Sequence, residues 1–172
     1  HKINYVSTRG MEGSFSAAEA IVKGIADDKG LFVPTKIPAL SVSFDELAKM
    51  TYQQVAKLVI GSFFSDFTCE EIDYCVDNAY DEKFEVPEIA KITKAGGANF
   101  LELYHGKTAA FKDMALSILP YLMTTSMKKL GVDKKVCILT ATSGDTGKAA
   151  LEGFADVENT EIIVFYPKDG VS

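Results

Sequence analysis

Residues 136–165 read "VCILTATSGDTGKAALEGFADVENTEIIVF", and this stretch decides the fold class. Its two apolar runs, "VCIL" and "IIVF", flank a segment of helical character and are typical of buried parallel strands. Such strands are joined by helical crossovers in α/β proteins. We therefore predict strands over 134–142 and 160–167, with a helix over 146–155 between them.

The region before this unit continues the alternation of strands and helices. Segments 89–93 and 98–104 have strand character, and an apolar-periodic segment over 109–131 predicts a long helix. Pro120 should kink or divide that helix, because proline lacks an amide proton and clashes with the preceding turn. An open parallel sheet normally has more strands than these, so we expect the chain to be incomplete.

Mostly helical patterns occupy the N-terminal half, after a short strand predicted over 3–7. A helix of about three turns is expected within 14–30, ended by the left-handed conformation that Gly30 permits. The segment 52–63 carries an apolar stripe at helical spacing, which indicates another helix.

Two capping-box pairs mark further helix starts in this half. Ser43 with Glu46 and Thr68 with Glu71 have the spacing at which hydroxyl and carboxylate satisfy the first free amides of a helix. Helices should therefore start near residues 44 and 69. The predicted domains are 1–86, mostly helical, and 87–172, the first part of an α/β domain.

The composition excludes several classes of protein. The 172 residues carry a formal charge of −6, so no basic field is available for nucleic acid or an anionic membrane surface. Three cysteines without Cys-x-x-Cys spacing and two histidines are too few and too scattered for a zinc site. No apolar run is long enough to cross a membrane. These features favour a cytoplasmic protein without a metal.

The stretch "YHGKTAAFKD", residues 104–113, contains two lysines. Lys107 follows a glycine and precedes a threonine, as in a phosphate-binding loop, but that motif needs glycine at position 101, which is Leu101. The same test fails for Lys148, because position 142 is Thr142. An exposed, solvated lysine is the favoured interpretation of Lys107.

Lys112 has apolar neighbours on both sides, from Ala109 to Phe111 and again at Met114 and Ala115. A partly desolvated lysine favours the neutral amine, which can attack a carbonyl carbon. The alternative is an ordinary lysine of an amphipathic helix whose ammonium group reaches solvent. Periodicity alone favours this second interpretation.

The loop between the predicted strand and helix, residues 140–150, is the second candidate site. Its glycines allow close backbone approach, its hydroxyls are hydrogen-bonding groups, and free amides at a helix start favour an anion. Ligands of open α/β sheets also bind beyond the carboxyl ends of strands. The glycines are Gly144 and Gly147, and the hydroxyls belong to Thr142, Ser143 and Thr146. A simple turn with a helix cap is the alternative.

Taken together, these residues resemble the threonine synthase family, within the tryptophan-synthase-β-like group of pyridoxal-phosphate enzymes. The pairing of His-Gly-x-Thr-x-Ala-Phe-Lys-Asp with Thr-Ser-Gly-Asp-Thr-Gly is specific to that family. The resemblance covers nearly the whole chain and rests on these stretches: "YVSTRG" at 5–10, "SFSAAEAIVKGIADDKGLFVP" at 14–34, "LELYHGKTAAFKD" at 101–113, "TATSGDTGKAA" at 140–150 and "YPKDGVS" at 166–172.

The resemblance implies a site for pyridoxal 5'-phosphate. It assigns Lys112 as the catalytic lysine that bonds to the cofactor, with Phe111 and Asp145 beside the cofactor. Substrate binding falls to the loop residues Thr142, Ser143, Gly144 and Thr146. Asp113 is interpreted as a structural residue at a helix start.

The implied reaction converts O-phospho-L-homoserine and water to L-threonine and phosphate. Two alternatives stay open: a related phospho-lyase that releases a keto acid, and a non-catalytic module that retains the fold. Position 107 departs from the family pattern, which usually has proline there. Family members are much longer, so we expect the 172 residues alone to be inactive.

Overall fold

The computed structural model describes residues 2–170. The chain forms two compact units, one made of residues up to 76 with 122–133, the other of residues 77–121 with those from 134 onward. These units are groupings in space, so the predicted domains, 1–86 and 87–172, stay a prediction.

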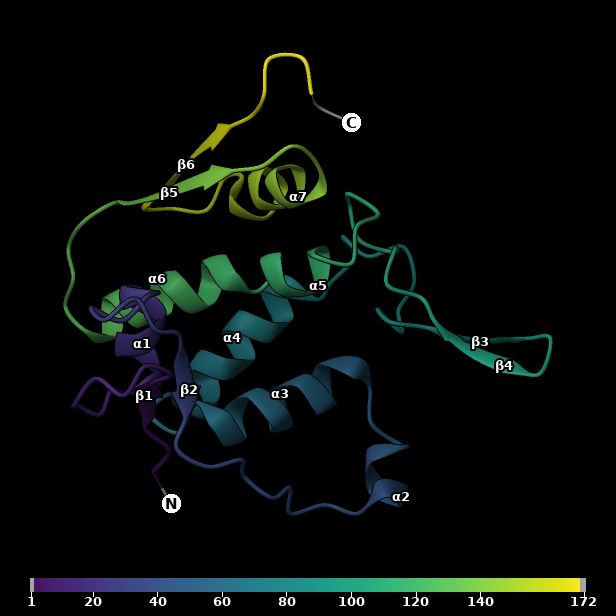
Figure 1. The fold of residues 1–172 in the computed structure, drawn as a ribbon. Coiled ribbons are helices and arrows are strands. Elements are labelled where there is room, and N and C mark those ends of the chain that lie inside the picture. The colour runs from purple at the N-terminus through teal and green to yellow at the C-terminus, as the bar shows by residue number, and fades with distance from the viewer. Residues whose placement is uncertain (1, 171–172) are drawn as a thin grey trace. The chain divides into compact units, whose positions relative to one another are not determined.

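The first unit is mostly helical (Figure 1). Its two short strands pair antiparallel, with Tyr5 opposite Pro34. Buried Ile3, Tyr5, Ala17 and Ala20 form its core, which aromatic side chains surround. Its elements are β1 Tyr5–Ser7, α1 Ala17–Lys23, β2 Phe32–Pro34, α2 Phe44–Leu47, α3 Tyr52–Phe63, most of α4 Cys69–Ala79 and most of α6 Leu119–Lys129.

Capping boxes begin helices α1 to α4 of this unit. Ser43 accepts a hydrogen bond from the amide of Glu46, whose carboxylate accepts one from the amide of Ser43. Thr68 and Glu71 make the same reciprocal pair. Both predicted helix starts are therefore confirmed. The expected helix over 52–63 is also present.

The helix expected within 14–30 is shorter than predicted. It begins after a capping box at Ser16 and ends at Lys23, because Gly24 takes a φ of 72° and donates its amide proton to the carbonyl of Ala20. The prediction that Gly30 ends the helix is wrong. Ile25, counted as part of the apolar stripe, is exposed.

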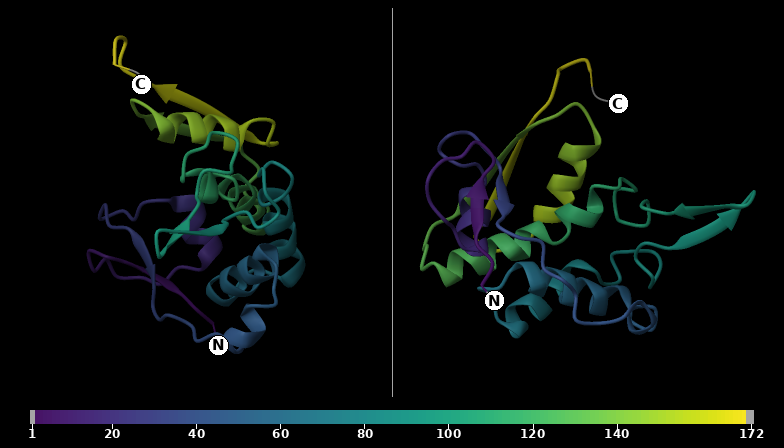
Figure 2. Two further views of the ribbon diagram at one scale, coloured as in Figure 1. Left: turned by 90° about the vertical axis from the view of Figure 1, so that its right-hand side faces the viewer. Right: turned by 60° about the horizontal axis from the view of Figure 1, so that its bottom comes forward.

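The second unit contains the parallel strand pair that the sequence predicts (Figures 1 and 2). Strands β5, Val136–Ala141, and β6, Thr160–Phe165, run parallel in register, with Val136 opposite Thr160. Helix α7, Asp145–Phe154, packs against β6 and covers one face of the pair. The predicted strand–helix–strand unit and its α/β class are confirmed.

The strands of this pair are not fully buried, contrary to prediction. Their side chains alternate between half-buried and exposed, and Leu139, Ile163 and Phe165 are exposed. Within residues 2–170, only the face toward α7 is covered. The apolar runs are typical of strands that are buried on both faces. In the described residues, helix α7 covers one of these faces.

The two upstream strands form a separate antiparallel hairpin, β3 Ile92–Ala95 with β4 Ala98–Leu101, that projects from the rest of its unit (Figures 1 and 2). The strand expected over 89–93 starts later because Ile89 has a φ of 61°, outside the β region. Strand β4 ends at Leu101 rather than at 104.

The long helix expected over 109–131 is divided, as Pro120 predicts. Helix α5 covers Asp113–Leu116, and α6 begins at Leu119 with Pro120 in its first turn, where the missing amide costs nothing. Residues 109–112 are turns rather than helix, since Ala109 has a φ of 56°.

Helices α5 and α7 approach each other closely at Gly153. A Cβ atom added at Gly153 would lie 2.3 Å from the carbonyl oxygen of Leu116. Backbone atoms cannot move aside as a flexible side chain can, so only glycine allows this packing.

We predict opposite effects for two glycine-to-alanine changes near helix ends. Gly153→Ala should destabilise the second unit by about 1–3 kcal/mol, because overpacking outweighs helix propensity. Gly61→Ala in α3 meets nothing within 4 Å and should stabilise by up to about 1 kcal/mol. Urea unfolding midpoints measure both. A stabilising Gly153→Ala would contradict the close approach.

Candidate functional site

Lys112 lies at the start of α5, half-buried, with its Nζ 4.7 Å from the centre of the Phe111 ring. Among residues 2–170, no carboxylate pairs with this ammonium group. By contrast, Lys83, Lys107 and Lys135 of the same unit each form an ion pair. Lys112 is therefore a half-buried lysine whose ammonium group lies over an aromatic ring rather than against a carboxylate.

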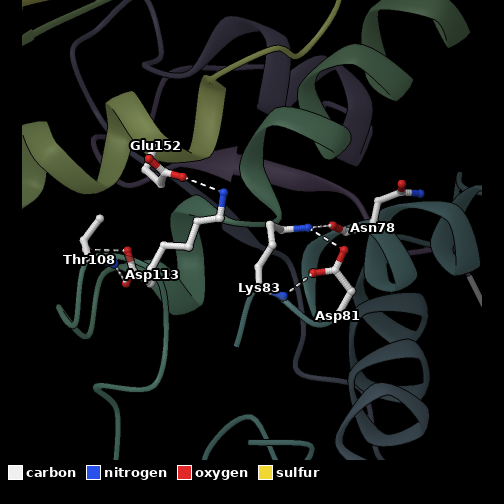
Figure 3. Close-up of polar contacts among 7 residues, drawn as sticks. Asn78, Asp81, Lys83, Thr108, Asp113 and Glu152 are labelled. Carbon is white, nitrogen blue, oxygen red and sulfur yellow. Dashed lines mark hydrogen bonds and ion pairs between the residues drawn. The ribbon is translucent and has the colours of Figure 1, made fainter. Parts of the chain in front are cut away.

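The carboxylate of Asp113, which is buried, holds the turn in front of Lys112 (Figure 3). The Thr108 amide donates to one oxygen at 2.9 Å, and the Thr108 hydroxyl donates to the other at 2.6 Å. Asp113 thus binds the preceding loop directly, which is the structural role expected of it, although the contact is a loop clamp rather than a dipole effect.

His105, also buried, precedes this turn and lies between two carboxylates. Its Nε2 is 2.6 Å from Glu102 Oε2, and its Nδ1 is 3.5 Å from Glu85 Oε2. The bond to Glu102 is the largest cause that raises the pKa of His105, and it lowers the pKa of Glu102 in turn. The pair therefore favours an imidazolium bound to a carboxylate.

The loop after β5 leaves several amides free. The Gly144 amide donates to Thr142 Oγ1 at 3.3 Å, and no side chain caps α7. Among residues 2–170, the amides of Ser143, Asp145 and Thr146 have no hydrogen-bond partner. Unpaired amides at the start of a helix attract an anion such as a carboxylate or phosphate.

Lys112 and the loop after β5 belong to one unit, but no polar contact joins them within residues 2–170. Within the described residues, no hydrogen bond or ion pair joins Lys112 to the loop Thr142–Thr146. They are connected instead through α7, on which α5 packs. The assigned roles of Lys112, Phe111, Asp145 and the loop residues stay predictions.

Lys107 is half-exposed and forms an ion pair with Glu152 of α7, with Nζ 2.6 Å from Oε1. This pair lines a polar cavity of about 300 Å³, together with Lys83, Ser117, Tyr121 and Asp156. The Lys83 ammonium group turns to Asp81 and the Asn78 carbonyl, at 2.7 and 2.5 Å (Figure 3).

Sequence reasoning missed the roles of His105 and Glu152. The spacing of Glu102 and His105 carries a weak signal, because residues this close can pair locally. Glu152 carries none, since its partner lies on a distant segment. Across residues 2–170 there is no cluster of metal-binding side chains and no helix suited to span a membrane.

The parallel strand–helix–strand unit with an unpaired lysine and a free-amide loop defines an α/β protein with a mostly helical N-terminal part. Residues 4–80 match the family model described as threonine synthase N terminus. The chain is 34% identical to threonine synthase of Schizosaccharomyces pombe, over 99% of this chain and 35% of that protein. It is also 34% identical to human threonine synthase-like 1, over 90% of this chain and 22% of that protein.

Solved structures agree with this match. PLP-bound threonine synthase from Brucella melitensis superposes with a TM-score of 0.88 at 31% identity, over 99% of this chain and 37% of that one. The chain is therefore similar to the N-terminal region of threonine synthases. It spans about a third of the length of the threonine synthases it matches, 35% and 37% in these two cases.

We predict that His105 titrates above its ordinary pKa and makes stability depend on pH. Because its pKa is raised in the folded state, its stabilising effect is complete below about pH 6.5 and is lost as pH rises through the folded value. Glu102 has a lowered pKa, so its contribution is lost when acid protonates it.

The measurement is urea unfolding at several pH values, for the wild-type chain and His105→Gln. The variant should lack the stability loss between neutral and alkaline pH, and NMR titration of the wild-type imidazole should report the raised pKa. A His105 that titrates below pH 6.5 would contradict the pairing.

We also predict that Asp113→Asn destabilises the loop before Lys112 by about 1–3 kcal/mol, because an amide NH₂ would face the Thr108 donors. Asp133→Asn at an exposed position is the control and should change little. The readout is urea unfolding together with amide hydrogen exchange at Thr108. Equal effects of the two changes would show that the clamp contributes nothing.

Proposed function

We propose that this chain is the N-terminal part of a pyridoxal-phosphate-dependent threonine synthase, which converts O-phospho-L-homoserine and water to L-threonine and phosphate. The observation that carries the proposal is Lys112, which is half-buried on a turn and has no carboxylate partner among residues 2–170. The family match supports the assignment. Residues 87–172 are proposed as the first part of the catalytic domain.

The residues present fit the cofactor. An ammonium group without a counterion can lose its proton and bond to an aldehyde carbon, which is what Lys112 would do with pyridoxal phosphate. Phe111 and Asp145 are the proposed cofactor neighbours. When bound, the cofactor supplies an electron sink that stabilises negative charge at substrate carbons.

The protein's own groups would bind the substrate and move protons. Free amides of the loop after β5, with the hydroxyls of Thr142, Ser143 and Thr146, would hold the substrate carboxylate. Gly144 admits the substrate close to the backbone. The Lys112 amine would act as general base and acid, accepting and returning protons at the reacting carbons of the substrate.

A related phospho-lyase is the second candidate, which would use the same lysine and release a keto acid. The identity to threonine synthase equals that to the human threonine synthase-like protein, which favours keeping both reactions. A non-catalytic module is less well supported, because Lys112 and the loop are intact.

Further ligands for cofactor and substrate would come from other parts of a longer protein, so the 172 residues alone should not form threonine. A cytoplasmic location is also proposed.

The test uses the full-length protein and the variant Lys112→Ala. The wild type should gain a visible absorbance band with pyridoxal phosphate, and borohydride reduction should fix the cofactor on Lys112. Lys112→Ala should lose the band and about 10²–10⁴-fold in kcat, while Lys94→Ala on the exposed hairpin should not.

Labelling of another lysine would refute the assignment of Lys112. Product analysis with O-phospho-L-homoserine then separates the two reactions, since threonine indicates the synthase and a keto acid indicates the lyase. Absence of both products with an intact absorbance band would favour a non-catalytic role.

A further inference from the structure

An ion pair links the loop before Lys112 to helix α7. Lys107 Nζ lies 2.6 Å from Glu152 Oε1, and each side chain is nearly half-exposed, at 49% and 41%. Glu152 is the largest cause that raises the pKa of Lys107. Lys107, which the sequence predicts to be solvated, thus forms an ion pair with the Glu152 carboxylate of helix α7.

The next residue of α7 makes the second contact with the same segment. Gly153 packs directly against the carbonyl of Leu116 at the end of α5. Two consecutive residues of α7 therefore contact the segment 107–116 at both of its ends. Lys112 lies between these two points of attachment.

No other cation of the cavity can take over the ion pair. The Lys83 ammonium group is held by Asp81 and the Asn78 carbonyl, on the side away from Glu152 (Figure 3). The remaining acidic groups of the cavity are Asp113, which holds Thr108, and Asp156. Removing Lys107 would leave Glu152 among like charges.

We propose that Lys107 and Glu152 are positioning residues, which hold the loop that carries Lys112 on the helix whose first turn forms the anion-binding loop. This inference rests on the proposed function. That function places Lys112, which Glu152 near the C-terminal end of α7 helps to position, and the anion-binding loop at the N-terminal end of α7 in one site. Lys107 reaches no reacting atom. It acts through the backbone from Thr108 to Lys112, which Asp113 makes rigid.

The experiment compares Lys107→Met, Glu152→Gln and the exchange Lys107→Glu with Glu152→Lys in the full-length protein. Matched controls are Lys135→Met and Glu161→Gln, an exposed ion pair of 2.8 Å between neighbouring strand segments of the same unit. Amide hydrogen exchange over residues 106–113 is measured without cofactor, and kcat and KM are measured with it.

Each single change should speed hydrogen exchange over 106–113 and lower kcat by about two- to fivefold, the range that an exposed ion pair allows, with a smaller change in KM. The charge-swapped double variant should regain most of the lost hydrogen-exchange protection and most of the lost kcat. High salt should make the hydrogen exchange and the kcat of the wild type more like those of the single variants, because salt screens exposed charges. The control pair should alter neither readout.

Unchanged exchange over 106–113 in both single variants would overturn the proposal. The proposal would also be overturned if the charge-swapped double variant, Lys107→Glu with Glu152→Lys, showed the sum of the effects of the two single variants on hydrogen exchange and kcat. The two hypotheses can fail separately. If the wild type binds no pyridoxal phosphate but the loop still loosens, the proposed function is wrong and the positioning contact stands. If the cofactor binds normally and the loop does not respond, only the positioning role is wrong.

Discussion

The buried carboxylate of Asp113 is the interaction on which the candidate site depends. It satisfies the amide and the hydroxyl of Thr108 together and so closes the turn that presents Lys112. A buried carboxylate is stable only when hydrogen bonds replace its water, so the loop and the helix start stabilise each other. Lys112 directly precedes Asp113, so its backbone belongs to the turn that this carboxylate closes.

The charges around this turn leave the half-buried ammonium group of Lys112 without a carboxylate partner among residues 2–170. Lys107 pairs with Glu152 and Lys83 pairs with Asp81, whereas the Lys112 ammonium group lies over the Phe111 ring. His105, which precedes the turn, is held by Glu102, and this contact raises the pKa of the imidazole. Structural ion pairs thus hold Lys83 and Lys107, whereas Lys112 keeps an ammonium group that the proposed function assigns to the cofactor.

The parallel strand pair is another part of the structure whose meaning depends on context. Helix α7 covers one face, while Leu139, Ile163 and Phe165 are exposed on the other. Strands in parallel sheets are usually covered on both faces. The chain spans about a third of the length of the threonine synthases it matches. The apolar composition of these strands is that of strands covered on both faces.

Local patterns in the sequence determined the elements whose causes are local. Capping boxes at Ser43 and Thr68 gave the helix starts, and Pro120 gave the break between α5 and α6, because each effect acts within one turn. The family motif pointed to Lys112 and the loop after β5 without any geometry. Tertiary structure alone decided that Gly24 ends the first helix, that Asp113 binds Thr108 and that Lys107 meets Glu152. Those outcomes depend on backbone angles and on groups brought together from separate segments, which periodicity and spacing do not encode.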